Sequence, residues 1–365
     1  MIHVFIGTKA QFIKMAPVLR ALDSMGVQYN LIDTGQHWEI TQALAVLFDL
    51  REPDVSLRPK GKNISTLSQA AIWFLSSLLL YLFNKRKIRE WIFRGQGGIC
   101  LVHGDTLTTL VSALFAKRVG IKVAHVEAGL RSFNFLHPFP EELIRVIVMY
   151  LSDVLFAPND LAFQNLVKMK VRGQIVNTQE NTVFDALEYV SKKLTHIPEV
   201  SRPYALVTAH RAELVLSHRR LEFLLKALEA IPPDLSIVFV MHDVTLNQLK
   251  RFRLLKKLEE LPNVYILPLQ GYAEFQALLQ RAQFLITDGG SIQEEAEILQ
   301  VPCLILRKHT ERKVGTNAML AGYDLERVRY FLKNYENFRG QPSLNVYSPS
   351  KQIADFVRVW NDSRG

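Results

Sequence analysis

Short apolar runs alternate along the chain with longer segments whose apolar residues recur at helical spacing. In the first half the runs span residues 2–6, 29–32, 99–102, 122–126 and 154–157. The alternation resumes in the second half at residues 204–207, 236–241, 264–267, 284–286 and 303–306. Strands that alternate with helices predict a parallel sheet with helices on both faces. The pattern therefore predicts an α/β protein with two doubly wound parallel-sheet domains.

The interval between the two series of strands contains the domain boundary. Residues 194–203 hold two prolines and show no periodicity, and a hinge near residues 170–174 is also compatible with the pattern. We place the boundary at residue 172, so that residues 1–172 form the first domain and residues 173–349 the second. A helix expected within residues 350–365 could cross back to the first domain. A chain of 365 residues is long enough for two such domains, which we expect to face a cleft.

The most apolar stretch covers residues 65–83. Its length reaches the lower range of a membrane span, but serines and a glutamine interrupt it. Apolar residues recur there at helical spacing, namely Ile64, Leu67, Ala71, Leu75, Leu78 and Leu82. This spacing predicts an amphipathic helix buried between domains or subunits. The basic run that follows, Lys85, Arg86, Lys87 and Arg89, makes peripheral membrane contact an alternative, which we do not favour.

Charge and cysteine content narrow the class of protein. The net charge of +9 fits an anionic partner, but the basic residues are scattered and no aromatic-rich basic module predicts nucleic-acid binding. Cys100 and Cys303 lie inside apolar runs, where buried free thiols are expected rather than a disulfide. The first residues form a strand and not a secretory signal. These features predict a cytoplasmic protein.

Polar residues gather where the predicted strands end. Because ligands of an open parallel sheet bind beyond the carboxyl ends of its strands, these residues are the candidate site. In the first domain they are Gly7, Thr8, Lys9, Lys14, Thr34, Gly35, Gln36, His37, His103, Gly104, Asp105, Thr106, His125, Glu127 and Gly129. In the second domain they are His210, Arg211 and Glu213, followed by the turn at residues 288–295.

The turn Asp-Gly-Gly-Ser-Ile-Gln-Glu-Glu at residues 288–295 leads from a strand into a helix. Gly289 and Gly290 permit positive φ and close backbone approach, so that the helix start could bind a diphosphate. Ser291 could donate to a phosphate oxygen, or it could form a capping box with Glu294. The capping box does not account for Glu295, which could accept hydrogen bonds from a ribose diol.

Two nucleotide-binding motifs are missing. No Gly-x-Gly-x-x-Gly follows a predicted strand, and no Walker loop occurs. The sequence therefore predicts a site for a nucleoside diphosphate without NAD and without ATP hydrolysis, and it predicts no cofactor.

Several segments, taken in order, resemble the bacterial non-hydrolysing UDP-N-acetylglucosamine 2-epimerases. They are Gly-Thr-Lys-Ala-Gln-Phe-Ile-Lys-Met-Ala-Pro at 7–17, Thr-Gly-Gln-His at 34–37, Val-His-Gly-Asp-Thr at 102–106, His-Val-Glu-Ala-Gly-Leu-Arg at 125–131, Pro-Phe-Pro-Glu-Glu at 138–142, Asn-Thr-Val-Phe-Asp-Ala-Leu at 181–187, Val-Thr-Ala-His-Arg at 207–211 and Thr-Glu-Arg at 310–312. The resemblance implies a fold like that of the GT-B glycosyltransferases, a UDP-sugar in the cleft, a homodimer and no metal.

The resemblance also implies a mechanism and a set of site residues. UDP is eliminated across C1 and C2 of a UDP-N-acetylhexosamine and added back to the other face of C2. Asp105, Glu127 and Glu141 match the acid and base positions, and His210 completes the catalytic set. Lys14, His210 and Ser291 would hold the diphosphate, Glu295 the ribose, and Phe275 would stack on uracil. The remaining substrate-binding candidates are Lys9, Gln36, His37, Arg145, Arg211, Gly289 and Gly290.

The chain departs from the family pattern at two places. Lys9-Ala10-Gln11 stands where Arg-Pro-Glu is common, and Asp288-Gly289-Gly290-Ser291 stands where Asp-Ser-Gly-Gly is common. A lysine replaces the bidentate fork of arginine by a point charge. Both departures keep the type of site and leave the identity of the sugar open.

Each carboxylate also has a structural interpretation. Asp105 could cap the helix that begins at Thr106, Glu127 could be a buried acceptor, and Glu141 could complement a helix dipole. His103, Asp105, His125 and Glu127 resemble a metal-ligand set, but alternation along the strands points several of them to opposite faces. We therefore expect no metal site.

Three other functions are compatible with the pattern. They are a hydrolysing 2-epimerase that releases free N-acetylmannosamine, a glycosyltransferase that uses a UDP-sugar, and a catalytically silent nucleotide-sugar binder at a membrane. The set of three carboxylates argues against a silent binder.

Overall fold

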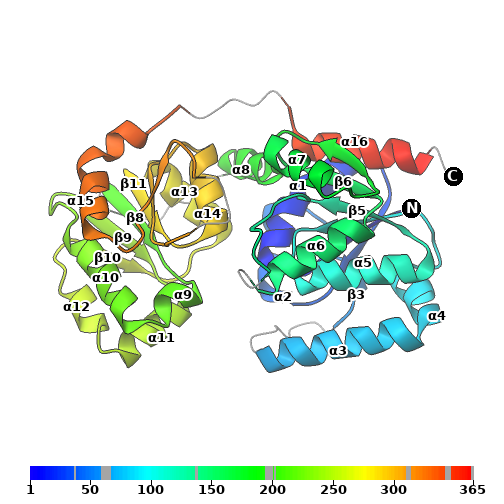
Figure 1. Ribbon diagram of the computed structural model, residues 1–365, viewed down its shortest axis with the longest axis horizontal. Helices are drawn as coiled ribbons and strands as arrows, with labels where there is room; N and C mark the ends of the chain where they lie inside the picture. The colour runs from blue at the N-terminus through cyan, green and yellow to red at the C-terminus, as the bar shows by residue number, and fades with distance from the viewer. Residues whose placement is uncertain are drawn as a thin grey trace. The chain divides into compact units, whose positions relative to one another are not determined.

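The computed structural model describes residues 1–36, 38–58, 67–135, 139–193, 200, 203–309, 314–341 and 347–362. They form two compact units, drawn in Figure 1. Unit 1 contains Met1–Tyr189 and the C-terminal segment that carries helix α16 (Pro349–Asp362), and unit 2 contains Val190–Asn345. Both units have a parallel sheet flanked by helices, as predicted.

Unit 1 has a seven-stranded parallel sheet in the order β3-β2-β1-β4-β5-β6-β7 among its described residues. Its strands are β1 (Ile2–Ile6), β2 (Tyr29–Asp33), β3 (Val55–Ser56), β4 (Ile99–His103), β5 (Lys122–Val126), β6 (Val154–Ala157) and β7 (Gln174–Asn177). The central strands β1, β2 and β4 are buried along their whole length. Burial on both faces explains why these strands are continuous apolar runs rather than alternating ones.

Two helical layers enclose the sheet of unit 1 (Figure 1). Helix α1 packs against α16, whereas α5 packs against α3 and α6. The helices of unit 1 are α1 (Lys9–Ser24), α2 (Trp38–Leu47), α3 (Leu67–Phe83), α4 (Lys85–Lys87), α5 (Leu107–Val119), α6 (Glu141–Leu151), α7 (Asp160–Lys168) and α8 (Val183–Ser191), together with a π-helical turn at Ile88–Ile92.

The predicted boundary at residue 172 lies before the end of unit 1. Strand β7 pairs with β6 and completes the first sheet, and most of α8 belongs to the same unit. The strand is short and only partly buried, so its apolar pattern is too weak to mark it in the sequence.

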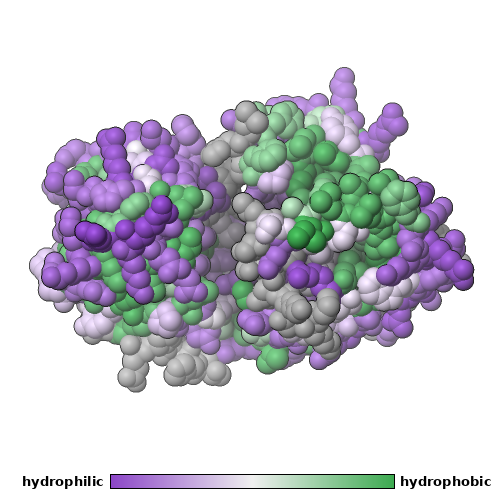
Figure 2. Space-filling model, turned by 90° about the horizontal axis from the view of Figure 1, so that it is seen from below, coloured by the Kyte–Doolittle hydropathy of each residue, from purple (hydrophilic) through white to green (hydrophobic). Residues whose placement is uncertain are grey.

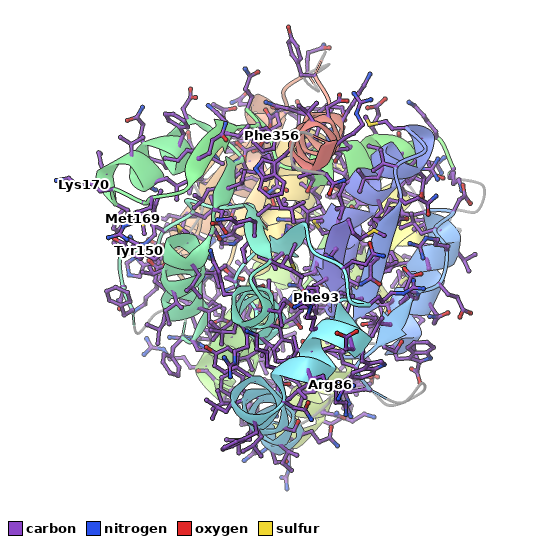
Figure 3. The ribbon with its side chains drawn as sticks, turned by 90° about the vertical axis from the view of Figure 1, so that its right-hand side faces the viewer. Arg86, Phe93, Tyr150, Met169, Lys170 and Phe356 are labelled. Atoms are coloured by element: carbon purple, nitrogen blue, oxygen red, sulfur yellow. The ribbon has the colours of Figure 1, made fainter. Side chains whose placement is uncertain are left out.

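Helix α16 joins the C-terminal segment to unit 1. The amino group of Met1 lies 2.8 Å from Asn361 Oδ1, and the backbone N–H of Ser350 donates to Asp185 Oδ2 at 2.8 Å. The ring of Phe356, labelled in Figure 3, meets Phe156 of β6 edge-on with 5.4 Å between centroids. Contacts at both ends and in the middle thus hold α16 in place.

Unit 2 has a six-stranded parallel sheet in the order β10-β9-β8-β11-β12-β13 among its described residues. Its strands are β8 (Tyr204–Thr208), β9 (Ser236–Val240), β10 (Val264–Leu267), β11 (Phe284–Thr287), β12 (Cys303–Ile305) and β13 (Ala318–Leu320). Its helices are α9 (Ala212–Val215), α10 (His218–Glu229), α11 (Asp243–Arg251), α12 (Leu255–Glu259), α13 (Tyr272–Arg281), α14 (Gly290–Ile298) and α15 (Leu325–Asn334), with a 3₁₀ turn at Tyr335–Phe338. Cys100 and Cys303 are buried free thiols, as predicted.

Helix α3 forms as predicted, and burial of its predicted face between subunits stays a prediction, because the side that it buries within this chain is another one. Trp73 and Ser77 face the protein, whereas Ala71, Leu75 and Leu82 are exposed in this chain. Trp73 joins the core under β4 and α5, and burying this large ring fixes the rotation of the helix. Ile64 to Thr66 lie outside the described residues. Among the described residues, no helix is long and apolar enough to cross a membrane.

Candidate functional site

Each unit places its predicted site residues at the point where the strand order reverses. In unit 1 this point lies between β1 and β4, and in unit 2 it lies between β8 and β11. Loops that follow such neighbouring strands diverge and leave a crevice at the carboxyl edge of the sheet. The two sets of residues are described separately below.

In unit 1 the turn after β1 is tied to the turn after β4 by Gln11. Thr8 caps α1, and Gln11 completes the capping box. The buried amide of Gln11 also donates to the carbonyl oxygen of His103 at 2.9 Å and to Thr106 Oγ1 at 3.0 Å. Gln11 therefore holds the turns after β1 and β4 at a fixed separation. Lys9 is the first residue of α1. Gly7 leaves no room for a side chain, because an added Cβ would lie 2.1 Å from Thr34 Oγ1.

Glu127 is the centre of a buried polar cluster beyond β5. Its Oε1 accepts from Lys14 Nζ at 2.7 Å and from Asn181 Nδ2 at 2.9 Å. His103 Nε2 lies 3.1 Å from its other carboxylate oxygen. The side chains of Lys14 and Glu127 are only 5% and 8% exposed. The interpretation of Glu127 as a buried acceptor is thus correct. The same contacts bring Lys14, His103 and Asn181 together around its carboxylate.

Glu127 adopts a left-handed backbone conformation with φ of 66°. This conformation is uncommon for a residue that is not glycine, asparagine or aspartate. Because the ion pair with Lys14 forms at this position, the strained turn directs the carboxylate into the cluster.

Asp105 belongs to a second charged group in unit 1. Thr106, not Asp105, caps α5, so the structural interpretation of Asp105 as a helix cap is wrong. Instead the Asp105 carboxylate pairs with Arg145 of α6, whose other guanidinium nitrogen donates to Glu142 Oε2 at 2.8 Å. Desolvation lowers the pKa of Arg145, but Asp105 and Glu142 outweigh it and the net pKa is raised.

Glu142 anchors the segment that precedes α6. It accepts from Arg131 Nε at 2.5 Å and from the backbone N–H groups of Ser132 and Phe133 at 3.1 and 3.2 Å. Burial raises the pKa of Glu142, but these hydrogen bonds and the two arginines hold the net pKa below its ordinary value. Glu142 is therefore an ionised structural carboxylate.

Glu141 differs from its neighbour. It is the first residue of α6, where a carboxylate complements the helix dipole as the structural interpretation supposed. Its Oε2 is nevertheless buried without a hydrogen-bond partner among the described residues. A buried acceptor normally has a partner. Within the described part of the chain Glu141 thus has an oxygen that accepts no hydrogen bond, whereas both oxygens of Glu142 accept one or more.

His103 is the last residue of β4 and His125 lies within β5, and the two make separate contacts. His125 Nε2 lies 2.7 Å from the carbonyl oxygen of Gly104, and burial lowers the pKa of His125 to about 4. His103 contacts Glu127 instead. In the part of the chain that the structure describes, no group of three or more histidine, cysteine or acidic residues is arranged to hold a metal ion.

In unit 2 Asp288 joins the turn after β11 to the turn after β8. Its buried carboxylate accepts from the backbone N–H of His210 at 3.1 Å and from that of Arg211 at 2.8 Å. The His210 ring stacks on His242 with 4.4 Å between centroids and is one-third exposed. Asp288 therefore places the predicted residues His210 and Arg211 beside the start of α14.

The start of α14 differs in two ways from the prediction. Gly289 is the N-cap and α14 begins at Gly290, so Ser291 lies inside the helix, is exposed and does not form the capping box. Gly289 has φ of −86°, and Gly290 is not among the residues with positive φ. Close approach accounts for Gly289, because an added Cβ would lie 3.2 Å from Cε1 of His210.

Glu295 lies one turn further along α14. It is buried and accepts from Gln276 Nε2 at 2.6 Å. Burial, and then the nearby Glu295 carboxylate, raise the pKa of Tyr272 well above its ordinary value. Phe275 is partly buried against the core on the same side of the sheet. Gln36 follows β2, and His37 lies outside the described residues.

The sequence pattern missed four residues of these clusters as site candidates. They are Asn181, Arg131, Glu142 and His242. Three of them stand inside the quoted family segments, at 125–131, 138–142 and 181–187. The fourth, His242, lies two residues after the end of β9, where strand-end polarity could have marked it.

Comparison with known proteins identifies the family of this chain. A family model described as UDP-N-acetylglucosamine 2-epimerase matches residues 20–339. The chain belongs to this family. The UDP-N-acetylglucosamine 2-epimerase of Methanocaldococcus jannaschii is 32% identical and covers 98% of both chains. The protein of that name from Campylobacter jejuni is 32% identical over 87% of this chain and 84% of its own.

Solved structures of epimerases agree with the fold. The UDP-GlcNAc 2-epimerase of Neisseria meningitidis, bound to UDP-GlcNAc, superposes with a TM-score of 0.81 at 28% identity and 99% coverage of both chains. The M. jannaschii epimerase in complex with UDP-GlcNAc and UDP superposes with a TM-score of 0.78 at 29% identity, covering 98% of this chain and 99% of its own. The predicted GT-B-like class, with two doubly wound parallel-sheet domains, is confirmed.

Proposed function

We propose that this chain is a non-hydrolysing epimerase that inverts C2 of UDP-N-acetylglucosamine or a close derivative. The observation that carries the proposal is the set of three carboxylates in unit 1, Asp105, Glu127 and Glu141, each in a different charge environment at the carboxyl edge of one sheet. Removing and returning a proton at C2 requires such groups, because the C2 proton is not next to a carbonyl.

Glu141 has the environment expected of the proton-transfer group. Its Oε2 has no partner within the described residues, so that oxygen is available to a substrate proton. Asp105 is paired with Arg145, and a paired carboxylate can serve on the other face of the sugar when substrate binding displaces the arginine. Glu127 shares its oxygens with Lys14 and Asn181 and would position Lys14 toward the departing diphosphate.

The diphosphate would be bound by the start of α14 in unit 2. The backbone N–H of Gly290 and the exposed Ser291 hydroxyl lie at the positive end of a nine-residue helix, whereas the N–H of Gly289 donates to Thr287 Oγ1 at 3.0 Å. His210 and Arg211, held by Asp288, lie beside it. Stabilising the charge of UDP as it leaves C1 lowers the barrier to elimination. Lys9, Gln36, His37, Phe275 and Glu295 remain proposed contacts to the rest of the UDP-sugar.

Turnover of UDP-GlcNAc in deuterated water tests this proposal. We expect UDP-ManNAc to form with deuterium at C2, and the recovered UDP-GlcNAc to gain deuterium as well, because the glycal is reprotonated from solvent. Free UDP and free N-acetylmannosamine, the products of hydrolysis, should not accumulate together. Release of free N-acetylmannosamine would identify a hydrolysing enzyme instead, and unchanged UDP-GlcNAc without deuterium would contradict the proposal.

The expected homodimer stays a prediction. Sedimentation of the purified chain, with and without UDP, measures it directly.

A further inference from the structure

Helix α6 distributes its charged and apolar side chains in an unusual way. Glu142 is fully buried and Arg145 is only 7% exposed, whereas Leu143, Ile147 and Tyr150 are exposed by 42%, 37% and 56%. A surface helix ordinarily exposes its charges and buries its apolar residues. Figure 2 shows hydrophobic surface gathered over unit 1 on the side seen from below. Because burying a charge costs free energy, the reason for placing this pair inside lies in what the pair contacts.

Arg145 joins Glu142 to Asp105. One terminal nitrogen of its guanidinium pairs with Asp105 Oδ2, and the other donates to Glu142 Oε2 at 2.8 Å. Asp105 directly precedes Thr106, the N-cap of α5, and α5 packs beside α6 (Figure 1). The side chain of Glu142 is inaccessible, whereas that of Asp105 is 27% exposed. Of the two carboxylates that share Arg145, Asp105 is therefore the one that a substrate can reach.

Glu142 is held in place by groups other than Arg145. Its Oε1 accepts from Arg131 Nε at 2.5 Å and from the backbone N–H of Phe133 at 3.2 Å. Its Oε2 accepts from the backbone N–H of Ser132 at 3.1 Å as well as from Arg145. Hydrogen bonds of this kind favour the ionised carboxylate and fix its position. Glu142 is thus a fixed negative charge beside Arg145.

Without Glu142, release of Asp105 would leave a buried cation alone. The Asp105 carboxylate has to separate from Arg145 before it can exchange a proton with the sugar. The Arg145 side chain is only 8% exposed, and a charge that loses its partner in such surroundings is strongly disfavoured. With Glu142 still bound to its other nitrogen, Arg145 keeps a counter-ion during the separation.

We infer that Glu142 is a positioning residue, which holds Arg145 in place while Asp105 is released to the substrate. The inference rests on the proposed function, because it gives Glu142 a part in proton transfer at C2. The same contacts fix the first turn of α6, where Glu141 is the other proposed proton-transfer group. Glu142 thereby supports both carboxylates without contacting the sugar.

Two substitutions at Glu142 separate charge from shape. Glu142→Gln keeps the shape and removes the charge, whereas Glu142→Asp keeps the charge on a side chain one methylene shorter. At saturating UDP-GlcNAc, the rate of deuterium exchange at C2 should fall by about 100-fold in Glu142→Gln, since a shift of about 1 Å at a reacting group can cost that much. Glu142→Asp should retain more of the rate. UDP affinity should stay nearly constant in both variants. A Glu142→Gln protein more active than Glu142→Asp would overturn the inference.

Asp153 provides a matched control at the other end of the same sheet. It directly precedes β6, and its carboxylate also accepts from two cations, Lys117 and Lys122, and from the backbone N–H of Val123. Asp153→Asn should lower the free energy of unfolding, measured with urea, and leave the exchange rate of the folded protein unchanged. An equal fall in exchange in Asp153→Asn and Glu142→Gln would show a general effect of instability and would overturn the inference.

A double-mutant cycle tests whether Glu142 acts through Arg145. In an Arg145→Met background, Glu142→Gln should not lower exchange further, because the cation that Glu142 holds is absent. This comparison does not need the single Glu142→Gln variant to fold. Losses that multiply would overturn the inference. Wild-type exchange that Glu142→Gln leaves unchanged would overturn this inference alone, whereas a wild-type chain without exchange would contradict the proposed function and this inference with it.

Discussion

Two glutamates of unit 1 differ in what their surroundings allow. Glu127 is held by a buried lysine and a buried asparagine, whereas Glu141 Oε2 has no hydrogen-bond partner in the part of the chain that the structure describes. Residue type alone does not separate them, since both follow strand-end or helix-start patterns. The separation comes from contacts with Lys14 and Asn181, which lie 113 and 54 residues away in the sequence.

The Glu141→Gln substitution should abolish proton transfer without disturbing the fold. An amide has almost the same shape, and its NH₂ or carbonyl replaces an oxygen that makes no hydrogen bond to any described residue. We expect the rate of deuterium exchange at C2 to fall by about 10² to 10⁴, while UDP affinity and the free energy of unfolding stay nearly constant. Exchange at the wild-type rate would remove Glu141 from the mechanism. Asp105→Asn should likewise stop exchange and leave UDP binding intact.

The Glu127→Gln substitution should instead reduce stability. It leaves the Lys14 ammonium buried without its counter-ion, and breaking one side of a buried pair costs about 3 to 5 kcal/mol of the free energy of unfolding. Urea denaturation measures this loss. The double variant Lys14→Met with Glu127→Gln should regain part of it, because the unpaired charge is gone. A double variant as unstable as the sum of both single changes would show that the two side chains do not interact.

At the scale of single elements, the start of α14 has the clearest role for a ligand. Gly289 is the N-cap residue of this helix, and no side chain caps it. Its first N–H groups are therefore not satisfied by a side-chain cap, unlike those of α5, where Thr106 accepts from Thr109. A helix start without a side-chain cap, at a strand-order reversal, is the expected geometry for binding an anion.

The Ser291→Ala substitution separates ligand binding from helix capping. Because Ser291 is exposed and does not cap α14, the free energy of unfolding should change by less than about 0.5 kcal/mol. UDP affinity should fall by about 1.5 to 3 kcal/mol if the hydroxyl donates to a charged phosphate oxygen. Thr106→Ala, which removes a real cap, should lower stability by about 0.5 to 2 kcal/mol and so calibrates the comparison. Normal UDP affinity in Ser291→Ala would leave the phosphate to the backbone donors.

Secondary structure was predictable where burial is continuous and not where tertiary contacts decide. The central strands β1, β4, β8 and β11 were predicted because both faces of a parallel sheet are buried. The short edge strand β7 was not predicted, and the leucine spacing of α3 did not mark Trp73 as the side chain that the helix buries within this chain. The cap of α14 was wrong because a serine two residues inside a helix has the same local spacing as a capping box.

At the scale of the whole molecule, the order of motifs along the chain predicted the family and the two α/β units. The strand-end rule depends only on parallel topology, and it selected Lys14, His103 and Glu127, which contact one another in unit 1. The rule could not predict which of these side chains contact one another. The links from Arg145 to Asp105 and from Asn181 to Glu127 cross between elements distant in sequence, and only the folded chain brings them together.

Buried titratable groups in unit 1 predict how stability depends on pH. Burial lowers the pKa of His3 and of His125 from 6.5 to about 4, whereas burial raises the pKa of Asp33 from 3.8 to about 6. The unfolded chain binds more protons at the two histidines, so each makes the folded state less stable as pH falls from about 6.5 toward 4. Asp33 acts in the opposite sense, because the folded state binds its proton more tightly in the window between about 6 and 3.8.

The comparison of urea denaturation at pH 7 and pH 5 measures the balance. At about 1.36 kcal/mol for each pKa unit, each histidine should cost about 2 kcal/mol over this interval, and Asp33 should return about 1 kcal/mol. The wild-type chain should therefore be less stable at pH 5 than at pH 7. The Asp33→Asn variant should lose more free energy of unfolding between pH 7 and pH 5 than the wild type does. At pH 7 it should be no less stable than the wild type. His125→Gln should make the pH dependence shallower, since the amide nitrogen of glutamine can replace Nε2 as the donor to the Gly104 carbonyl oxygen but does not titrate. A variant His125→Gln with the wild-type pH dependence would show that His125 is not the buried neutral group that its surroundings require.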